Sequence, residues 1–180
     1  MNVFATSLAK FLIALQKIDA TNGPISLSRG CPLTTYNTET RQAIMILNNK
    51  IDTHAITAIW NTAIASTWNK SPVWVHGDIS ANNLLVKNGK LSAVIDFGSM
   101  CIGDPACDLA IAWTFFKEKS REIFRTTLAI DNATWERSRG WALWKALIIC
   151  AQLPGTNHLE IEKSKQIINT IIADYSIRSP

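Results

Sequence analysis

Several polar residues near the middle of the chain are of types that can bind a metal ion and accept a proton. His76-Gly77-Asp78 is followed by Asn83, which lies five residues after Asp78, and Asp96 comes thirteen residues after Asn83. Asp96 is in turn followed by Phe and Gly. The order H-x-D-x-x-x-x-N and then D-F-G is typical of sites that transfer a phosphoryl group.

Each residue type suits a role in such a transfer, which needs positioning and charge neutralisation more than covalent help from the protein. Mg²⁺ prefers hard oxygen ligands and keeps several waters, so the oxygens of Asn83 and Asp96, together with phosphate oxygens, would hold it. Asp78 would stay off the metal and accept the proton of the attacking hydroxyl. His76 is expected to pack or fix the loop rather than act as a base.

Taken singly, these residues have structural explanations. A Gly-Asp pair and an Asn-Asn pair are common in turns, and Asp96 could cap the end of a strand. Their combination at two fixed spacings favours the catalytic interpretation.

Short strands surround these residues and would position them. We predict strands over Val73–Val75, Leu84–Lys87 and Leu91–Ile95, and Asn88-Gly89 between the last two is the signature of a tight hairpin. Because a hairpin returns the chain to its starting point, the residues just before and just after it would meet and share one metal ion.

The rest of the chain has helical patterns. Asp52 and Asp104 are predicted N-caps, the latter followed by Pro105 at the first helical position, and Thr38 is a third candidate cap. The predicted helices cover residues 3–20, 38–48, 52–68, 105–117, 120–129, 131–152 and 158–175. We expect a mainly helical α+β fold and a single domain over 1–180, with helical regions 1–70 and 113–180 around a catalytic core 71–112.

Composition places the chain among globular proteins. It has 180 residues, of which 47% are hydrophobic and 18% charged, and no apolar run approaches the roughly 20 residues that span a bilayer. The four cysteines show no CxxC spacing, and no basic segment precedes the first apolar pattern. We expect a cytoplasmic protein with reduced thiols that does not bind membranes.

The formal charge of +4 raises the alternative of a nucleic-acid-binding module. However, residues 71–110 contain four Asp against two Lys, and no helix-turn-helix, zinc-finger or RNA-binding signature accompanies the basic residues elsewhere. A serine hydrolase is also disfavoured, because no GxSxG motif is present.

The segment Val73–Trp113 closely resembles the C-terminal lobe of the aminoglycoside phosphotransferase family, a group of protein-kinase-like small-molecule kinases. The match includes Gly103-Asp104-Pro105 and Asp108-Leu109-Ala110. Less specific resemblance extends over residues 4–20, 29–33 and 139–145.

The resemblance implies ATP- or GTP-dependent phosphorylation of a hydroxyl of a small molecule, often an antibiotic, with Mg²⁺. It assigns Asp78 as catalytic base and Asn83 and Asp96 as metal ligands, with His76, Asp104 and Asp108 as structural support. The chain departs from the family at Ala81, where Pro is common, and at Asn82, where Gly is common. Asn tolerates left-handed backbone angles, so the loop is expected to survive.

The nucleotide-binding N-terminal lobe of the family has no counterpart in the sequence. None of the eight glycines forms a GxGxxG motif, and no strand with a central Lys precedes Asp78. We expect a C-terminal lobe that is weak or inactive alone and whose missing lobe could come from another chain; an inert fragment or scaffold is the alternative. From Ile111 onward seven acidic residues face ten basic ones, which disfavours a highly cationic substrate.

Overall fold

A computed structural model describes residues 1–178, except for the side chains of residues 158 and 178. Its strands are β1 (Val73–Val75), β2 (Leu84–Lys87), β3 (Lys90–Val94) and β4 (Cys101–Gly103). Its helices are α1 (Asn2–Gln16), α2 (Asn37–Ile46), α3 (Thr53–Ile64), α4 (Ile111–Thr114), α5 (Glu118–Leu128), α6 (Asn132–Cys150) and α7 (Ile161–Arg178). The predicted mainly helical α+β composition is confirmed.

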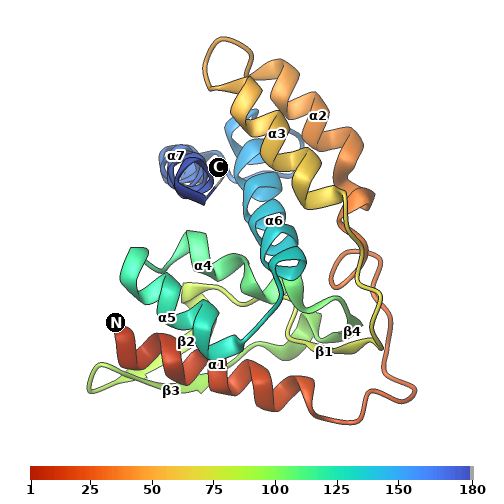
Figure 1. Cartoon of the computed structure of the whole chain (residues 1–180), viewed down its shortest axis with the longest axis vertical. Coiled ribbons are helices and arrows are strands. Elements are labelled where there is room, and N and C mark those ends of the chain that lie inside the picture. The colour runs from red at the N-terminus through yellow and green to blue at the C-terminus, as the bar shows by residue number, and fades with distance from the viewer. Residues whose placement is uncertain (179–180) are drawn as a thin grey trace.

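The strands form two separate antiparallel pairs. β2 pairs with β3, as the Asn-Gly turn predicts, and β1 pairs with β4 in the register Val75↔Cys101. β4 was not predicted, because its pairing depends on a partner strand, β1, that lies far away in the sequence. In Figure 1 both pairs lie in the lower part of the molecule, where β1 and β3 pack against α1.

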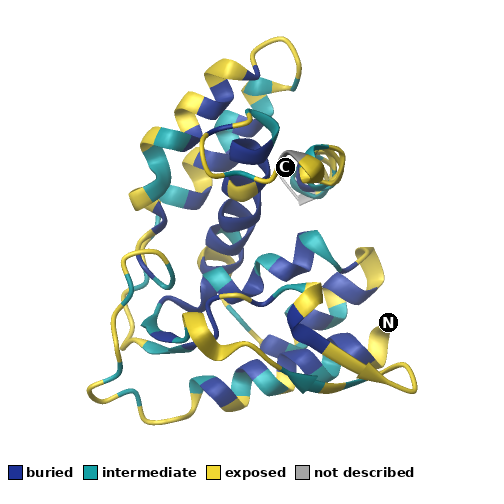
Figure 2. Ribbon diagram, turned by 180° about the vertical axis from the view of Figure 1, so that it is seen from behind, coloured by how far each residue is buried: buried dark blue, intermediate teal, exposed yellow. Residues whose placement is uncertain are grey.

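Helix α6 runs through the middle of the molecule and links its lower and upper parts (Figure 1). It is buried along most of its length (Figure 2), with α2 and α3 on one side and α7 on another. Its N-cap is Asp131, whose side chain accepts a hydrogen bond from the Thr134 N–H. A helix covered on several sides needs apolar or paired polar residues on those sides. The C-terminal half of α6 is accordingly mostly apolar, whereas Arg137 and Arg139 in its N-terminal half are buried in ion pairs.

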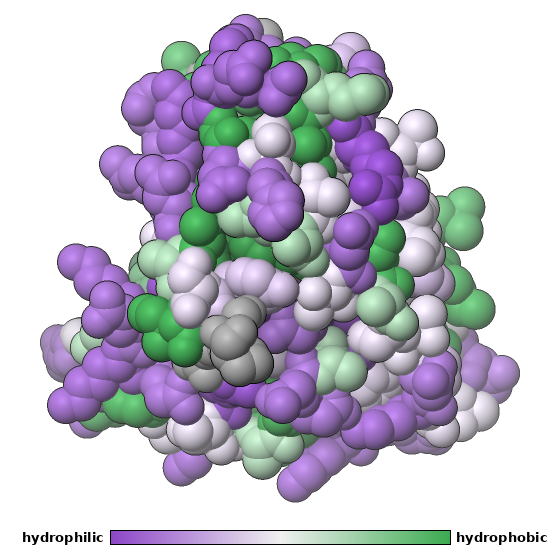
Figure 3. Space-filling model, turned by 45° about the horizontal axis from the view of Figure 1, so that its top comes forward, coloured by the Kyte–Doolittle hydropathy of each residue, from purple (hydrophilic) through white to green (hydrophobic). Residues whose placement is uncertain are grey.

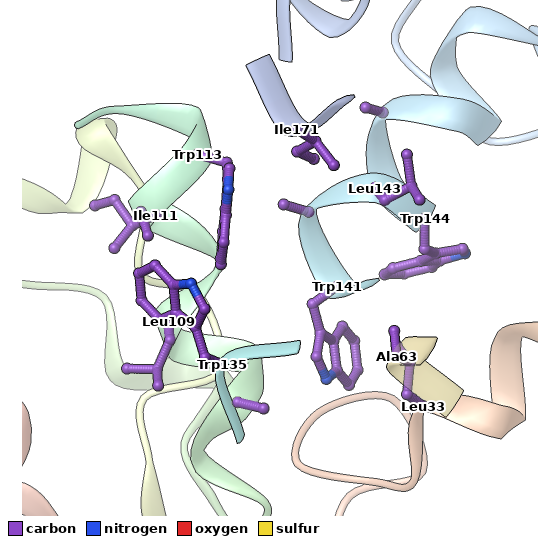
Figure 4. Packing of buried hydrophobic residues seen from close by; sticks show 14 of the residues in the cluster. Leu33, Ala63, Leu109, Ile111, Trp113, Trp135, Trp141, Leu143, Trp144 and Ile171 are labelled. Atoms are coloured by element: carbon purple, nitrogen blue, oxygen red, sulfur yellow. The ribbon is translucent and has the colours of Figure 1, made fainter. Parts of the chain in front are cut away.

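Aromatic side chains fill much of the space around α6 (Figure 4). Trp135 packs against Trp113 with ring centroids 4.5 Å apart, whereas Trp141 and Trp144 extend from the next turns of the helix. Gly140 lets α6 approach Leu33 and Ala63 closely, because a Cβ at this position would lie 2.4 Å and 2.6 Å from their side-chain carbons. The core therefore depends on this glycine.

Several helix ends differ from the predictions. The first helix ends at Gln16 rather than near Ala20, because the Asp19 side chain accepts hydrogen bonds from the N–H and hydroxyl of Thr21 and so favours a turn. Asp52 caps α3 as predicted, but the helix stops at Ile64. The predicted cap at Thr38 is wrong, since α2 already begins at Asn37.

The helix predicted over 105–117 is divided. Asp104 caps a 3-10 helix over Pro105–Ala110, which α4 continues only to Thr114. A new helix then begins with a reciprocal pair of hydrogen bonds between Lys117 and Ser120. This local capping geometry explains why the chain does not continue as one helix.

The surface in Figure 3 is largely hydrophilic, with hydrophobic side chains exposed between the polar groups. Among the described residues, no helix is both long and apolar enough to cross a membrane. The four cysteines are free thiols, as predicted.

Candidate functional site

The β2–β3 hairpin brings the predicted metal ligands to its base. Asn88 and Gly89 both have positive φ, 51° and 72°, as a two-residue hairpin turn requires. At the open end, the Ile95 N–H donates to the carbonyl oxygen of Asn83 at 3.0 Å. This bond joins Asn83 to the residue that precedes Asp96, so the hairpin closes beside both side chains.

Asn83 is also tied to Asp78. Its amide nitrogen donates to the carbonyl oxygen of Asp78 and to the Asp78 Oδ2, both at 2.9 Å. Asn83 is buried, whereas Asp78 is exposed. Because the amide nitrogen is engaged, the Asn83 Oδ1 is the atom that remains for a metal ion.

Asp96 has a left-handed backbone conformation, with φ 64° and ψ 65°. Only Gly, Asn and Asp adopt this conformation readily, which restricts the residues that fit here. The following Phe97 packs its ring 4.8 Å from the imidazole of His76 and 6.4 Å from the ring of Phe11. The exposed Asp96 carboxylate is thereby held on a fixed backbone.

The donor set fits Mg²⁺. An amide oxygen and a carboxylate are hard ligands, and Mg²⁺ completes its shell with waters and phosphate oxygens. Among the described residues, no group of three or more His, Cys, Asp or Glu side chains could hold a metal ion. This composition suits a cation that a phosphorylated ligand shares with the protein better than a closed structural site.

His76 is fully buried and links the loop to the hairpin. Its Nε2 lies 3.0 Å from the carbonyl oxygen of Ile95, while its Nδ1 accepts a hydrogen bond of 3.3 Å from the Asp78 N–H. These two bonds are both satisfied by the neutral tautomer with the proton on Nε2.

Asp108 holds the same loop from the opposite side. Its carboxylate accepts hydrogen bonds from the N–H groups of His76, at 2.7 Å, and Gly77, at 2.8 Å. Burial raises the pKa of Asp108 from 3.8 to about 6, although these two bonds act in the opposite direction. A buried carboxylate that accepts backbone donors thus fixes the chain just before Asp78.

Asp104 supports the next segment. It accepts from the Ala106 N–H at 3.0 Å and forms a buried ion pair with Arg137 of α6, with Oδ2 and Nε 2.6 Å apart. The 3-10 helix that carries Asp108 is therefore anchored to α6.

The two departures in the loop, Ala81 and Asn82, lie with Asn83 in a short 3-10 turn. Asn82 is not among the residues with positive φ. The expectation that its tolerance of left-handed angles preserves the loop is therefore wrong, because the loop adopts no such angle there.

A pocket of about 380 Å³ opens beside Asp78. It is lined by residues 77–82 of the loop and by side chains from α4, α6 and α7. Three basic residues of its wall, Arg29, Lys145 and Lys163, were not predicted. Lys145 and Lys163 reach the pocket only through the packing of α6 and α7, and Arg29 reaches it from the loop that precedes α2.

Comparison with known proteins gives a family match over most of the chain. The family model APH, described as the phosphotransferase enzyme family, matches residues 2–141. An aminoglycoside 3'-phosphotransferase of Escherichia coli is 45% identical over 47 residues, which cover 26% of this chain and 17% of that protein.

Solved structures share the fold. The GDP and kanamycin complex of APH(2")-IIIa has a TM-score of 0.68 with 16% identity, covering 96% of this chain and 63% of that one. A macrolide 2'-phosphotransferase type I has a TM-score of 0.58 with 17% identity over 96% of this chain and 58% of that chain. The chain thus spans about 60% of the length of these two structures.

Proposed function

This chain belongs to the phosphotransferase enzyme family, and from that premise we propose that it transfers the terminal phosphoryl group of ATP or GTP to a hydroxyl of a small molecule. The observation that carries the proposal is the arrangement at the hairpin base. There Asn83 is bonded both to Asp78 and to the residue before Asp96. In this proposal the hydrogen bonds hold the base beside one metal ligand, next to the residue that precedes the other.

In this proposal each residue has a defined task. The Asp78 carboxylate accepts the proton of the acceptor hydroxyl as its oxygen attacks the phosphorus. Asn83, through Oδ1, and Asp96 hold Mg²⁺, which when bound would neutralise charge on the phosphates. His76 and Asp108 keep the loop in place through the hydrogen bonds described above.

We further assign the chain to the C-terminal, acceptor-binding lobe of a kinase-like enzyme. Two observations support this assignment: the chain covers about 60% of the related structures, and the sequence contains no GxGxxG motif. A lobe on another polypeptide segment would complete the nucleotide site. Since one preorganised donor is typically worth about 10²–10³ in rate, the isolated chain is expected to turn over very slowly.

The first test is calorimetric titration of the chain with Mg·ATP and Mg·GTP. Asp96→Asn removes the charge but keeps a residue that tolerates the left-handed backbone, and we expect it to weaken Mg-dependent binding at least about tenfold. Asp52→Asn is the matched control, because Asp52 caps α3 and does not belong to the hairpin base. Equal affinities of the Asp96 variant and the control would contradict the metal assignment.

Asp78→Asn tests the base separately. We expect it to keep the nucleotide affinity of the wild type within about twofold while phosphoryl transfer, followed by release of ADP or GDP with hydroxylated acceptors, falls about 10²-fold or more. Transfer at an unchanged rate would exclude Asp78 as the base. Rapid turnover by the wild-type chain alone would refute the need for a second lobe.

A further inference from the structure

The pocket beside Asp78 has an excess of positive charge. Arg29, Lys145 and Lys163 line it, whereas the only acidic residues of its described wall are Asp78 and Glu160. Asp78 is reserved for the proton of the acceptor hydroxyl in the proposed function. The groups left to recognise the rest of the acceptor therefore comprise three cations and one carboxylate.

These cations are not neutralised by protein acids. Within the described part of the chain, neither the two lysines nor Arg29 belongs to an ion pair. Arg29 donates to the carbonyl oxygen of Ser28 at 2.8 Å, and the Lys145 Nζ lies 5.8 Å from the ring centroid of Trp144. Both lysines are exposed, so their ammonium groups remain available to a ligand.

The pocket wall also includes two tryptophans, Trp141 and Trp144, which are 4% and 8% exposed and so present only a small part of their rings to it. Trp144 stacks on Tyr36 with centroids 3.9 Å apart and donates its Nε1–H to Glu39 at 2.7 Å. Trp141 packs against Tyr36 from the side, at 5.2 Å. Such fixed aromatic surfaces favour ligands with an apolar framework. The Glu39 carboxylate is occupied by the indole and is not part of the pocket wall.

We propose that the acceptor is an anionic hydroxyl compound, in which an apolar framework carries the reacting hydroxyl and a carboxylate or similar group. The apolar part would lie against the Trp141–Trp144 wall and the anion near Lys145 and Lys163. This inference rests on the proposed function, because it takes the pocket to be the acceptor site. A polycationic acceptor would instead meet like charges in this pocket, which disfavours its binding.

Three para-substituted benzyl alcohols of similar size test the charge preference: para-(hydroxymethyl)benzoate, para-(hydroxymethyl)benzamide and para-(hydroxymethyl)benzylamine. Their affinities for the chain are measured by chemical-shift titration without nucleotide. We expect the benzoate to bind about fivefold or more tightly than the amine, with the neutral amide between them. In Lys145→Glu/Lys163→Glu the order should reverse.

Lys10→Glu provides the charge control, because Lys10 is exposed on α1 and does not line the pocket. The double variant Lys10→Glu/Lys17→Glu changes the net charge as much as Lys145→Glu/Lys163→Glu does. It should keep the wild-type order of affinities for the three compounds. Circular dichroism confirms that each variant is folded. Tighter binding of the amine, equal binding of all three compounds, no saturable binding of the benzoate, or an order unchanged in the pocket variant would each overturn the proposal.

The result is independent of phosphoryl transfer, since only equilibrium binding of the acceptor is measured. A benzoate preference without Mg·nucleotide binding would leave the pocket inference standing and remove the proposed donor. Transfer to a cationic acceptor without a benzoate preference would keep the proposed function and refute the anionic acceptor.

Discussion

Asp108 combines two demands that usually conflict. It is completely buried, which disfavours its charge, and yet its two oxygens accept the N–H groups that precede Asp78. The pKa of about 6 reflects the dominance of burial. The residue that orders the loop therefore changes its protonation state in a mildly acidic range.

This pKa predicts a pH dependence of stability. Because the folded chain binds the Asp108 proton more tightly than the unfolded chain, whose carboxyl has a pKa near 3.8, the added stability is fully present below 3.8 and is lost as pH rises through about 6. Relative to Asp108→Asn, the free energy of unfolding of the wild type should fall by about 2 kcal/mol between pH values of about 4.5 and 7.

Urea denaturation at a series of pH values, followed by circular dichroism, measures this difference. Asp108→Asn also loses one acceptor oxygen, but that loss does not vary with pH. Parallel pH profiles for the two proteins would show that the folded-state pKa of Asp108 is not raised.

At the level of elements, the close approach at Gly140 is a packing constraint that ordinary helix propensity opposes. Alanine is normally about 1 kcal/mol better than glycine inside a helix. At Gly140, however, the added methyl would meet Ala63 and Leu33 well inside contact distance. The geometry of α6 against α3 thus outweighs the local preference.

Gly140→Ala should therefore lower the free energy of unfolding by about 1–3 kcal/mol. The matched substitution Ala63→Gly removes the methyl on the opposite side. In a double-mutant cycle measured by urea denaturation, the double variant should be more stable than the sum of the two single effects predicts. Additive effects, or stabilisation by Gly140→Ala alone, would contradict the tight approach.

Elements differ in how far the sequence predicts them. The hairpin was predictable because Asn88-Gly89 forms a tight turn, and this turn sets which residues of the two strands pair. The helix caps at Asp52 and Asp104 were predictable because a cap acts on residues close to it in the sequence. In contrast, β4 pairs with β1, which lies far away in the sequence, and α6 is apolar on several faces. Neither segment has a hydrophobic periodicity from which its packing partners could be predicted. The pocket lysines were missed for the same reason: their position depends on how α6 and α7 pack.

On the scale of the whole molecule, one carboxylate joins three helices. Asp174 of α7 lies 2.9 Å from the Arg139 Nη2 of α6 and 3.3 Å from the Arg121 Nη1 of α5. Both arginines are nearly inaccessible to solvent. The network links the lower part of the molecule in Figure 1 to the C-terminal helix that lines the pocket.

Asp174→Ala should cost about 3–5 kcal/mol, because it leaves buried guanidinium groups without this partner. Glu162→Ala is the control on the same helix, since Glu162 pairs with Lys165 at the surface and its removal should cost less than about 1 kcal/mol. Denaturant titration of both variants measures the difference. Similar losses for the two substitutions would show that burial adds nothing to the Asp174 pairs.

The hairpin has a consequence for how this molecule can vary. The base of the hairpin is closed by the hydrogen bond from the Ile95 N–H to the Asn83 carbonyl oxygen, and no atom lies within 4 Å of a Cβ placed on Gly89 at the tip. The turn at the tip is therefore free of packing, whereas β3 packs against α1 and adds Leu91 and Val94 to the edge of the core.

Insertions or deletions made in matched pairs next to this turn, one residue in each strand, would lengthen or shorten the hairpin while preserving its closure. The separation of thirteen residues between Asn83 and Asp96 is then one of several lengths that the fold would tolerate. A change of length in only one strand would disturb the closure, and selection should remove it.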